Sequence, residues 1–268
     1  IFTSIVSEDI RHIIRNCNGL HLSFFDAFIN KLEEELGTQA VLQVGRTHGI
    51  QNTERFLHAI HDNGEQYLQP TYFMQSTHNI ISSTIAIDLK CHAYNTTYVH
   101  RGTSFENALL DALLRLRSGS IRNALLGGFD ELTDDYLQFF RRTGRWQFTP
   151  DGFAGEAAVS FLLDGQQHAH TLCRLDDLRL LYRPTPDTLR HALHDLLTAN
   201  SCSLGDIDAV LIGLNTNPDN DTVYLDTAAE LYPATPLIRY KHLFGESFSA
   251  SALAHYVAAT CLRRGHIP

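Results

Sequence analysis

Residues 104–128, SFENALLDALLRLRSGSIRNALLGG, contain the signatures of a helix and of a strand in one short stretch. Apolar residues recur every three or four positions over 104–117, which predicts an amphipathic helix. They are Phe105, Ala108, Leu109, Ala112, Leu113 and Leu116. The apolar run 123–126 enters Gly127-Gly128 and is typical of a short buried strand. A helix that leads into a buried strand indicates an α/β fold.

The same pattern recurs on both sides of this stretch. We predict helices over residues 20–36, 76–89, 187–199 and 249–264, and strands over 40–44, 94–99 and 209–214. A similar order of elements in the two halves indicates an internal duplication, and no linker rich in Pro, Gly or Ser separates them. We therefore expect residues 1–164 and 165–268 to be two related halves that share one continuous core.

The composition excludes several functional classes. The chain has 268 residues, with 21 Lys and Arg against 30 Asp and Glu, and a net charge of −9. Its arginines are scattered singly, whereas a nucleic-acid or anionic-membrane surface needs clustered cations. No apolar run is long enough to span a bilayer, and the first twenty residues lack the apolar segment of a signal peptide. We expect a soluble, cytoplasmic protein that binds no nucleic acid and has no membrane span.

Metal and cofactor sites are not expected either. The chain has 15 His and 5 Cys, but no C-x-x-C pair. The closest histidine pairs, His58 with His61 and His168 with His170, lack nearby Cys or Glu ligands at a helical or hairpin spacing. We therefore predict no bound metal and no tightly bound cofactor.

Three stretches carry a family resemblance. Residues 104–131 resemble the nucleophile helix of β-ketoacyl synthases and the strand that ends in Gly-Gly after it. Residues 148–164, FTPDGFAGEAAVSFLLD, are similar to the family's F-D-x-x-x-D-G-F-V-x-G-E-G-A segment and the following strand, and this match is the most specific of the three. Residues 240–252, YKHLFGESFSASA, are similar to K-x-x-x-G-H-x-x-x-A-A-G.

Residues 70–79, PTYFMQSTHN, resemble a short, divergent branch whose members are chain-length-factor-like subunits of aryl-polyene and resorcinol pathways. The resemblance covers about residues 40–268. It implies an α/β, thiolase-like five-layer αβαβα sandwich of two related halves, usually paired as a dimer. The family pattern continues beyond the final Ile-Pro to an N-S-F-G-F-G-G region, so either the second half is truncated or the sequence is a fragment.

The resemblance also places the family's catalytic residues. Condensing enzymes carry a cysteine at the N-terminus of the nucleophile helix, where the helix dipole favours the thiolate. Counting back from Gly127-Gly128 places Gly102 at this position. We expect the nearby Ser104 to act mainly as the helix N-cap, although it is also a candidate nucleophile. His100 and Arg101 are candidates for contact with an acyl-phosphopantetheine or an interface.

The two histidines of the family align with Leu214 and Glu246, and Lys241 is retained. An ionised carboxylate cannot donate the hydrogen bonds that stabilise an enolate. Lys241 and Glu246 are expected either to form an ion pair or to be separately solvated. We expect a turn-forming role for Asn215, Thr216 and Asp221, with a calcium loop as the minor alternative.

Together these positions predict a β-ketoacyl synthase-like subunit without the Cys-His-His residues, a pseudoenzyme that is inactive alone as a 3-oxoacyl-ACP synthase. We expect it to be the chain-length-factor-like partner of an active ketosynthase in fatty-acid or polyketide-type biosynthesis, as a heterodimer or homodimer. Strand 94–99 would form the dimer edge. Residues predicted to lie at this interface or along the acyl tunnel are Tyr94, Asn95, Tyr98 and Phe105.

Two alternatives stay open. The first alternative is a divergent acyltransferase or thioester hydrolase that uses Ser104, His100 or Glu246. The second alternative is a scaffold that binds acyl carrier protein and its acyl-phosphopantetheine. Because carrier proteins are acidic, the scaffold would need a local basic face, which Arg141, Arg142 and Arg145 supply.

Overall fold

The computed structural model describes residues 2–5, 41–46, 50–144 and 152–267, and side chains from residue 50 onward. The predicted helix over 20–36 lies outside these residues.

Six strands form one mixed sheet, in the order β3-β2-β4-β5-β1-β6. They are β1 (Phe2–Ile5), β2 (Val41–Arg46), β3 (Asn95–Tyr98), β4 (Asn123–Asp130), β5 (Ala157–Asp164) and β6 (Cys173–Arg174). Strand β2 is parallel to β3 and β4, while β5 is antiparallel to β4 and β1.

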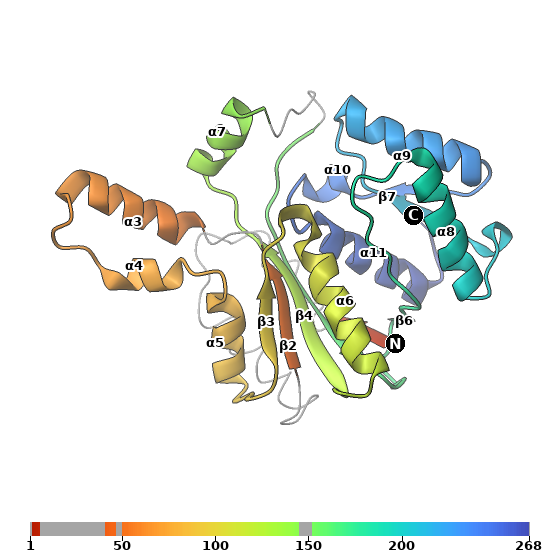
Figure 1. Cartoon of the computed structure of the whole chain (residues 1–268), viewed down its shortest axis with the longest axis horizontal. Coiled ribbons are helices and arrows are strands. Elements are labelled where there is room, and N and C mark those ends of the chain that lie inside the picture. Colours follow the sequence, from red (N-terminus) through yellow and green to blue (C-terminus); the bar gives the residue numbers. More distant parts are fainter. Residues whose placement is uncertain (1, 6–40, 47–49, 145–151, 268) are drawn as a thin grey trace.

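The core lies where β4 and β5 meet helix α6 (Ser104–Arg117). Residues 124–128 of β4 are all buried, as expected for a strand covered on both faces. Along β5 every second residue is buried, from Ala157 to Leu163. The apolar stripe of α6 packs against the same side of the sheet, and Figure 1 shows α6 lying along it. Residues 104–128 therefore form the centre of the described fold.

Helix α11 (Ala250–Arg264) joins this core from the other end of the chain. It contacts β5, β6 and α6, and Ala252 is fully buried among their side chains. The approach is close at Gly128, where an added Cβ would lie 2.7 Å from the Cβ of Ala252. Glycine at this position thus allows a helix of residues 165–268 to pack on the sheet of residues 1–164.

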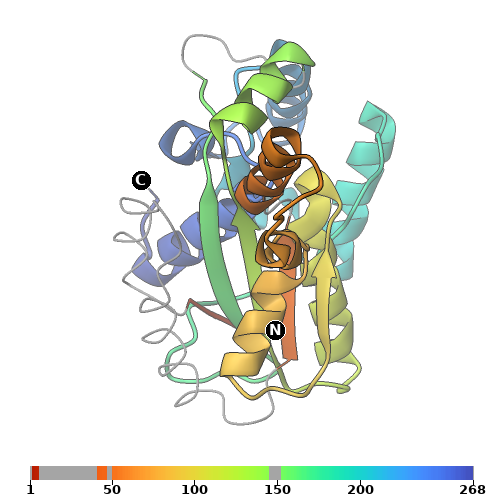
Figure 2. The same cartoon turned by 90° about the vertical axis from the view of Figure 1, so that its left-hand side faces the viewer.

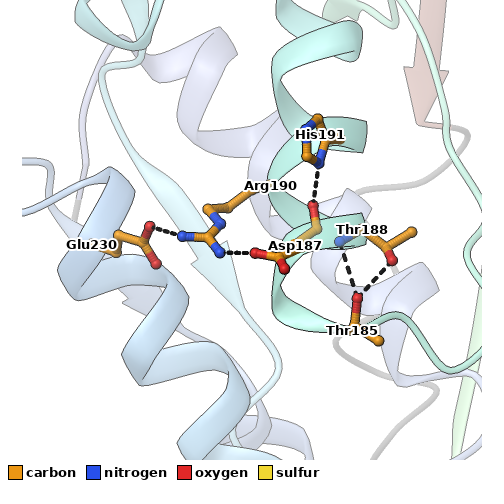
Figure 3. Close-up of polar contacts among 6 residues, drawn as sticks. All are labelled: Thr185, Asp187, Thr188, Arg190, His191 and Glu230. Atoms are coloured by element: carbon orange, nitrogen blue, oxygen red, sulfur yellow. Dashed lines mark hydrogen bonds and ion pairs between the residues drawn. The ribbon is translucent and has the colours of Figure 1, made fainter.

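A second, two-stranded parallel sheet consists of β7 (Val210–Ile212) and β8 (Leu237–Arg239). The helices α8 (Pro186–Ala199) and α9 (Pro218–Leu231) lie beside it in Figure 1. Arg190 on α8 donates to Glu230 on α9 at 2.6 Å and also pairs with Asp187 one turn earlier (Figure 3). Thr185 caps the start of α8 by accepting the N–H of Thr188. One guanidinium therefore links the two helices.

Helices α3 (Ile50–Asn63) and α4 (Pro70–Gln75) form an arm that extends away from the sheet. Figure 2 views the molecule from the side of this arm. None of the residues of either helix is buried, and Phe56 and Phe73 contact each other between them at a ring distance of 5.5 Å. Helix α5 (Ile80–Asp88) connects the arm to β2 and β3, against which it packs.

Several predicted bounds need correction. The predicted helix 76–89 begins only at Ile80, because Ser76 and Thr77 donate their hydroxyls to carbonyls of α4 and end that helix. Strand β4 continues past residue 126 to Asp130, since it is paired along its length with β5. Strand β7 is only three residues long, matching its partner β8.

Among the described elements, helices α3, α4, α7 (Asp134–Arg142) and α9 were not predicted. The short helix α10 (Lys241–Phe244) and strand β8 were also missed. In the part of the chain that the structure describes, no helix is long and apolar enough to cross a membrane.

Two adjacent leucines on α6 test the position of the core. Leu113 is 1% exposed and Leu114 is 56% exposed. We expect Leu113→Ala to lower the free energy of unfolding by about 2–5 kcal/mol, because it leaves a cavity in the core. Leu114→Ala, the matched control, should change it by less than about 0.5 kcal/mol. Urea denaturation monitored by circular dichroism measures both, and equal effects of the two variants would contradict this packing.

Candidate functional site

The loop before α6 contains Gly102, the residue that the resemblance aligns with the cysteine of condensing enzymes. Residues Arg101–Thr103 form a single 3-10 turn that leads directly into α6. Gly102 is exposed, and an added Cβ at this residue would have no atom within 4 Å. Arg101 has a φ of +55°, so the sharp turn is made immediately before the glycine. The start of α6 thus offers an open position without a reactive side chain.

Ser104 is not the N-cap that the sequence predicts. The N-cap residue is Thr103, and Ser104 is the first residue of α6. The Ser104 hydroxyl accepts the N–H of His100 at 2.8 Å and donates to the carbonyl of Arg101 at 2.7 Å. Because the 3-10 turn runs straight into α6, this side chain ties the turn to the helix instead of capping the first N–H groups. Ser104 is 2% exposed, and both of these bonds are with backbone rather than with a general base.

Two of the three segments that carry the family resemblance meet in space. The N–H of Glu246 donates to the carbonyl of Phe153 at 2.8 Å, and the N–H of Gly155 donates to the carbonyl of Glu246 at 2.9 Å. The backbones are so close that a Cβ on Gly155 would overlap the carbonyl of Phe244. Gly245 has a φ of +80° and faces Gly155. Only glycine fits both positions, and the backbone of Glu246 is fixed as a result.

The expected ion pair between Lys241 and Glu246 is confirmed. Their Nζ and Oε2 atoms are 2.8 Å apart, and the side chains are 15% and 12% exposed. The Asn215 amide donates to the same Oε2 atom at 2.7 Å. One carboxylate oxygen therefore accepts two side-chain donors, one from the start of α10 and one from the loop after β7.

The loop after β7 is organised by Asp221. Its carboxylate accepts the N–H groups of Asn215 at 2.9 Å and Thr216 at 3.1 Å. Asn217 caps the start of α9 by accepting the N–H of Asp219, and its own N–H donates to Oδ1 of Asn215. These bonds show the predicted capped turn. Among the described residues, no group of His, Cys, Asp or Glu is arranged to hold a metal ion.

Two tyrosines, Tyr224 and Tyr240, lie near the Glu246 carboxylate. Burial raises the pKa of Tyr240, and Tyr224 and the charges of Glu246 and Glu106 raise it further. Burial likewise raises the pKa of Tyr224, followed by the charge of Glu246. Both hydroxyls lie close to Gly213 at the end of β7. At neutral pH they are therefore neutral groups beside a carboxylate.

A small cavity of about 100 Å³ opens at the network. Its lining comes from the loop after β7, from β8, from α10 and from the segment before β5. The residues are Gly152, Phe153, Leu214, Asn215, Thr216, Asp221, Arg239, Lys241, His242 and Glu246. Of the predicted site residues, the structure brings Leu214, Lys241 and Glu246 together here. Asn215 was predicted only as part of a turn, and its bond to Glu246 is new.

The predicted interface and tunnel residues lie along β3 and α6. The ring of Tyr94 stacks under the guanidinium of Arg115 at 3.5 Å, and the Asn95 amide donates to the Ser82 carbonyl at 3.1 Å. Phe105 is 1% exposed and lies between Phe161 and His255.

Tyr98 packs partly buried against the core cluster, and its ring contacts His100. Burial raises its pKa, as do hydrogen bonds with Tyr94 and Asp111. In the proposed carrier-protein patch, Arg141 and Arg142 are exposed at the end of α7, and Arg145 lies outside the described residues.

No family model matches the chain. Curated relatives match short segments and are named "Putative phosphoenolpyruvate synthase regulatory protein". The relative from Dichelobacter nodosus is 54% identical over 56 residues, or 21% of each chain. Those from Janthinobacterium sp. and Neisseria gonorrhoeae are 29% and 38% identical over 75 and 55 residues. The chain spans about a fifth to a quarter of the length of these relatives.

Solved structures match most of the chain. The ishigamide ketosynthase/chain length factor has a TM-score of 0.72 at 21% identity, over 88% of this chain and 65% of that one. The type II polyketide ketosynthase AntDE, solved with the acyl-carrier protein AntF, has a TM-score of 0.70 at 16% identity, over 90% and 76%. A β-ketoacyl synthase from Burkholderia phymatum has a TM-score of 0.64 at 16% identity, over 90% and 67%. The predicted thiolase-like α/β fold is confirmed.

The contact between Gly155 and Gly245 is open to direct test. We expect Gly155→Ala to lower the free energy of unfolding by about 1–3 kcal/mol or more, because the new methyl overlaps a backbone carbonyl that cannot move freely. Gly102→Ala, where the added methyl meets open space, is the control and should change it by less than about 0.5 kcal/mol. Chemical denaturation of both variants decides the point, and a neutral Gly155→Ala would show that the segments are not so tightly packed.

Proposed function

We propose that this chain is a non-condensing, chain-length-factor-like subunit that pairs with an active ketosynthase in fatty-acid or polyketide-type, aryl-polyene-like biosynthesis. The observation that carries the proposal is Gly102 at the open start of α6. A side chain there would meet no neighbour within 4 Å, so the position has room for a nucleophile but does not supply one. The fold is that of ketosynthases, while the group that would hold the acyl chain is missing.

The hydrogen-bond donors for the enolate are not supplied by Leu214 and Glu246 either. Condensation requires N–H donors that stabilise an enolate oxygen. Leu214 has no donor, and the Glu246 carboxylate is an acceptor that holds Lys241 and Asn215. An enolate oxygen near Glu246 would meet a negative charge instead of a donor. We therefore expect no condensation by this chain alone.

A partner surface is available on the side of β3. This strand ends the six-stranded sheet in the part of the chain that the structure describes, so one row of its backbone groups faces away from the sheet. The arm lies on the same side and exposes Leu57, Phe73 and Met74, each 57–58% exposed. Large apolar side chains in one region are typical of a surface that a partner covers.

The partner would be a chain of the same fold that supplies the cysteine. Tyr94, Asn95 and Tyr98 lie at or directly before β3, Phe105 lies in the core at the start of α6, and we expect these residues to limit the length of an acyl tunnel. Acyl groups would arrive on the phosphopantetheine of an acyl carrier protein, which Arg141 and Arg142 would contact by charge complementarity. The solved AntDE complex contains such a carrier protein.

The regulatory-protein relatives support a second candidate, control of a phosphoenolpyruvate synthase. The 54% identity over 56 residues is the observation that favours it. This similarity spans about a fifth of the chain, whereas the similarity to ketosynthase structures spans about nine-tenths of it. We therefore place this candidate second.

Co-expression tests the main proposal. We expect the chain to form a one-to-one complex with an active ketosynthase from the same genome, measured by native mass spectrometry. The complex should condense malonyl and acyl groups on carrier protein, and activity should disappear when the partner's cysteine is replaced. Condensation by the isolated chain would overturn the proposal.

The arm provides the matched variants for this experiment. Leu57→Asp with Met74→Asp should weaken the complex at least about tenfold, because two charges would be buried in an apolar interface. Leu262→Asp, on an equally exposed leucine of α11 away from the arm, should leave it unchanged. All variants should keep the circular dichroism spectrum of the parent chain.

A coupled assay separates the second candidate from the first. Phosphoenolpyruvate synthase activity, measured with and without an equimolar amount of this chain, should stay constant if the ketosynthase-partner proposal holds. A loss or gain of synthase activity that is absent with an unrelated acidic protein would favour the regulatory function instead.

A further inference from the structure

The Glu246 side chain occupies a position that is built like a carboxylate-binding site. Its Oε2 atom accepts the Lys241 ammonium at 2.8 Å and the Asn215 amide at 2.7 Å. A cation and an amide N–H that converge on one oxygen are the usual partners of a bound carboxylate ligand. We propose that Lys241 and Asn215 form a carboxylate seat that the chain's own Glu246 fills, which closes the cavity to an anionic acyl group. This inference rests on the proposed function and extends it.

The Asn215 amide and the backbone of Lys241 are held in place independently of Glu246. Asn215 Oδ1 accepts the N–H of Asn217 at 3.1 Å, which turns the amide nitrogen toward the seat. The backbone N–H of Asn215 is fixed by Asp221. Lys241 begins α10, directly after Tyr240, which is 6% exposed. Truncation of Glu246 would therefore leave the amide in position and the Lys241 side chain rooted beside the cavity.

The charges around the cavity favour an anion once Glu246 is removed. The lining then holds Lys241 and Arg239 as cations against the single carboxylate of Asp221. Asp221 is already engaged by two backbone N–H groups. A largely buried ammonium without a counter-charge is costly, so it would recruit an anion from solution.

One further group points to a ligand of this class. Thr216 Oγ1 is buried and has no hydrogen-bond partner among the described residues, and Thr216 lines the same cavity. Its hydroxyl is an additional donor for a second carboxylate oxygen. With a volume of about 100 Å³ beside it, the emptied seat suits a carboxylate of two or three carbons, such as acetate or malonate.

Glu246→Ala tests the seat by chemical rescue. We expect the melting temperature of this variant to fall by at least about 5 °C in sodium chloride, because Lys241 loses its partner. Sodium acetate at the same ionic strength should return about 2 °C or more of this loss in a concentration-dependent way. The parent chain, whose seat is filled, should show no such difference between acetate and chloride.

Two further variants are the controls. Lys241→Met combined with Glu246→Ala removes the cation and should abolish the acetate effect. Glu246→Gln keeps an acceptor of the same shape in the seat and should also be insensitive to acetate. If Glu246→Ala is recovered only as aggregate, the yield of refolding from urea in acetate against chloride is the readout.

The seat is overturned if acetate does not stabilise Glu246→Ala, or if it stabilises the parent chain or the double variant to the same extent. These measurements use the chain alone and involve no partner. The seat can therefore fail while the complex with a ketosynthase forms, and the complex can fail while the seat binds acetate.

Discussion

The close approach of Gly155 and Gly245 is the constraint on which the site depends. Two backbones from distant parts of the sequence come together so tightly that neither position has room for a Cβ. The contact fixes the backbone of Glu246 through two hydrogen bonds and sets the segment before β5 against the end of α10. The position of the Glu246 carboxylate relative to Lys241 and Asn215 follows from this contact.

The sequence pattern predicted correctly those helices whose apolar stripe and ends are visible in the sequence itself. Helix α6 has the predicted bounds, and α8 and α11 each begin within one residue of their own predicted starts. Each of the three combines an apolar stripe with a clear start and stop. Helix α3 was missed although its apolar residues Phe56, Leu57 and Ile60 recur at helical intervals, and none of its residues is buried. Helix α9 carries the signal Asn217-Pro218 at its start, a cap followed by proline, which was read only as a turn.

In the site too, some contacts were visible in the sequence and others depend on how distant segments pair. Opposite charges at Lys241 and Glu246 were enough to predict their ion pair. The Asn215 contact was not predictable, because it depends on the pairing of β7 with β8, which brings the loop after one strand beside the residues that follow the other. Ser104 was misassigned because a serine before a helical pattern is usually its cap, whereas here a 3-10 turn moves the cap to Thr103.

The arm of α3 and α4 has a consequence for the dynamics of the chain. It is held at its base by Glu131, which accepts the N–H groups of Ile50 and Gln51, and by contacts of Glu54 with Thr133 and His58 with Asp135. Helices of this length are marginal in water without tertiary packing, and the arm buries no residue of its own. Its amide hydrogens should therefore exchange fast in the free chain and become protected when a second protein covers it, so that part of the folding of this molecule is completed only on assembly.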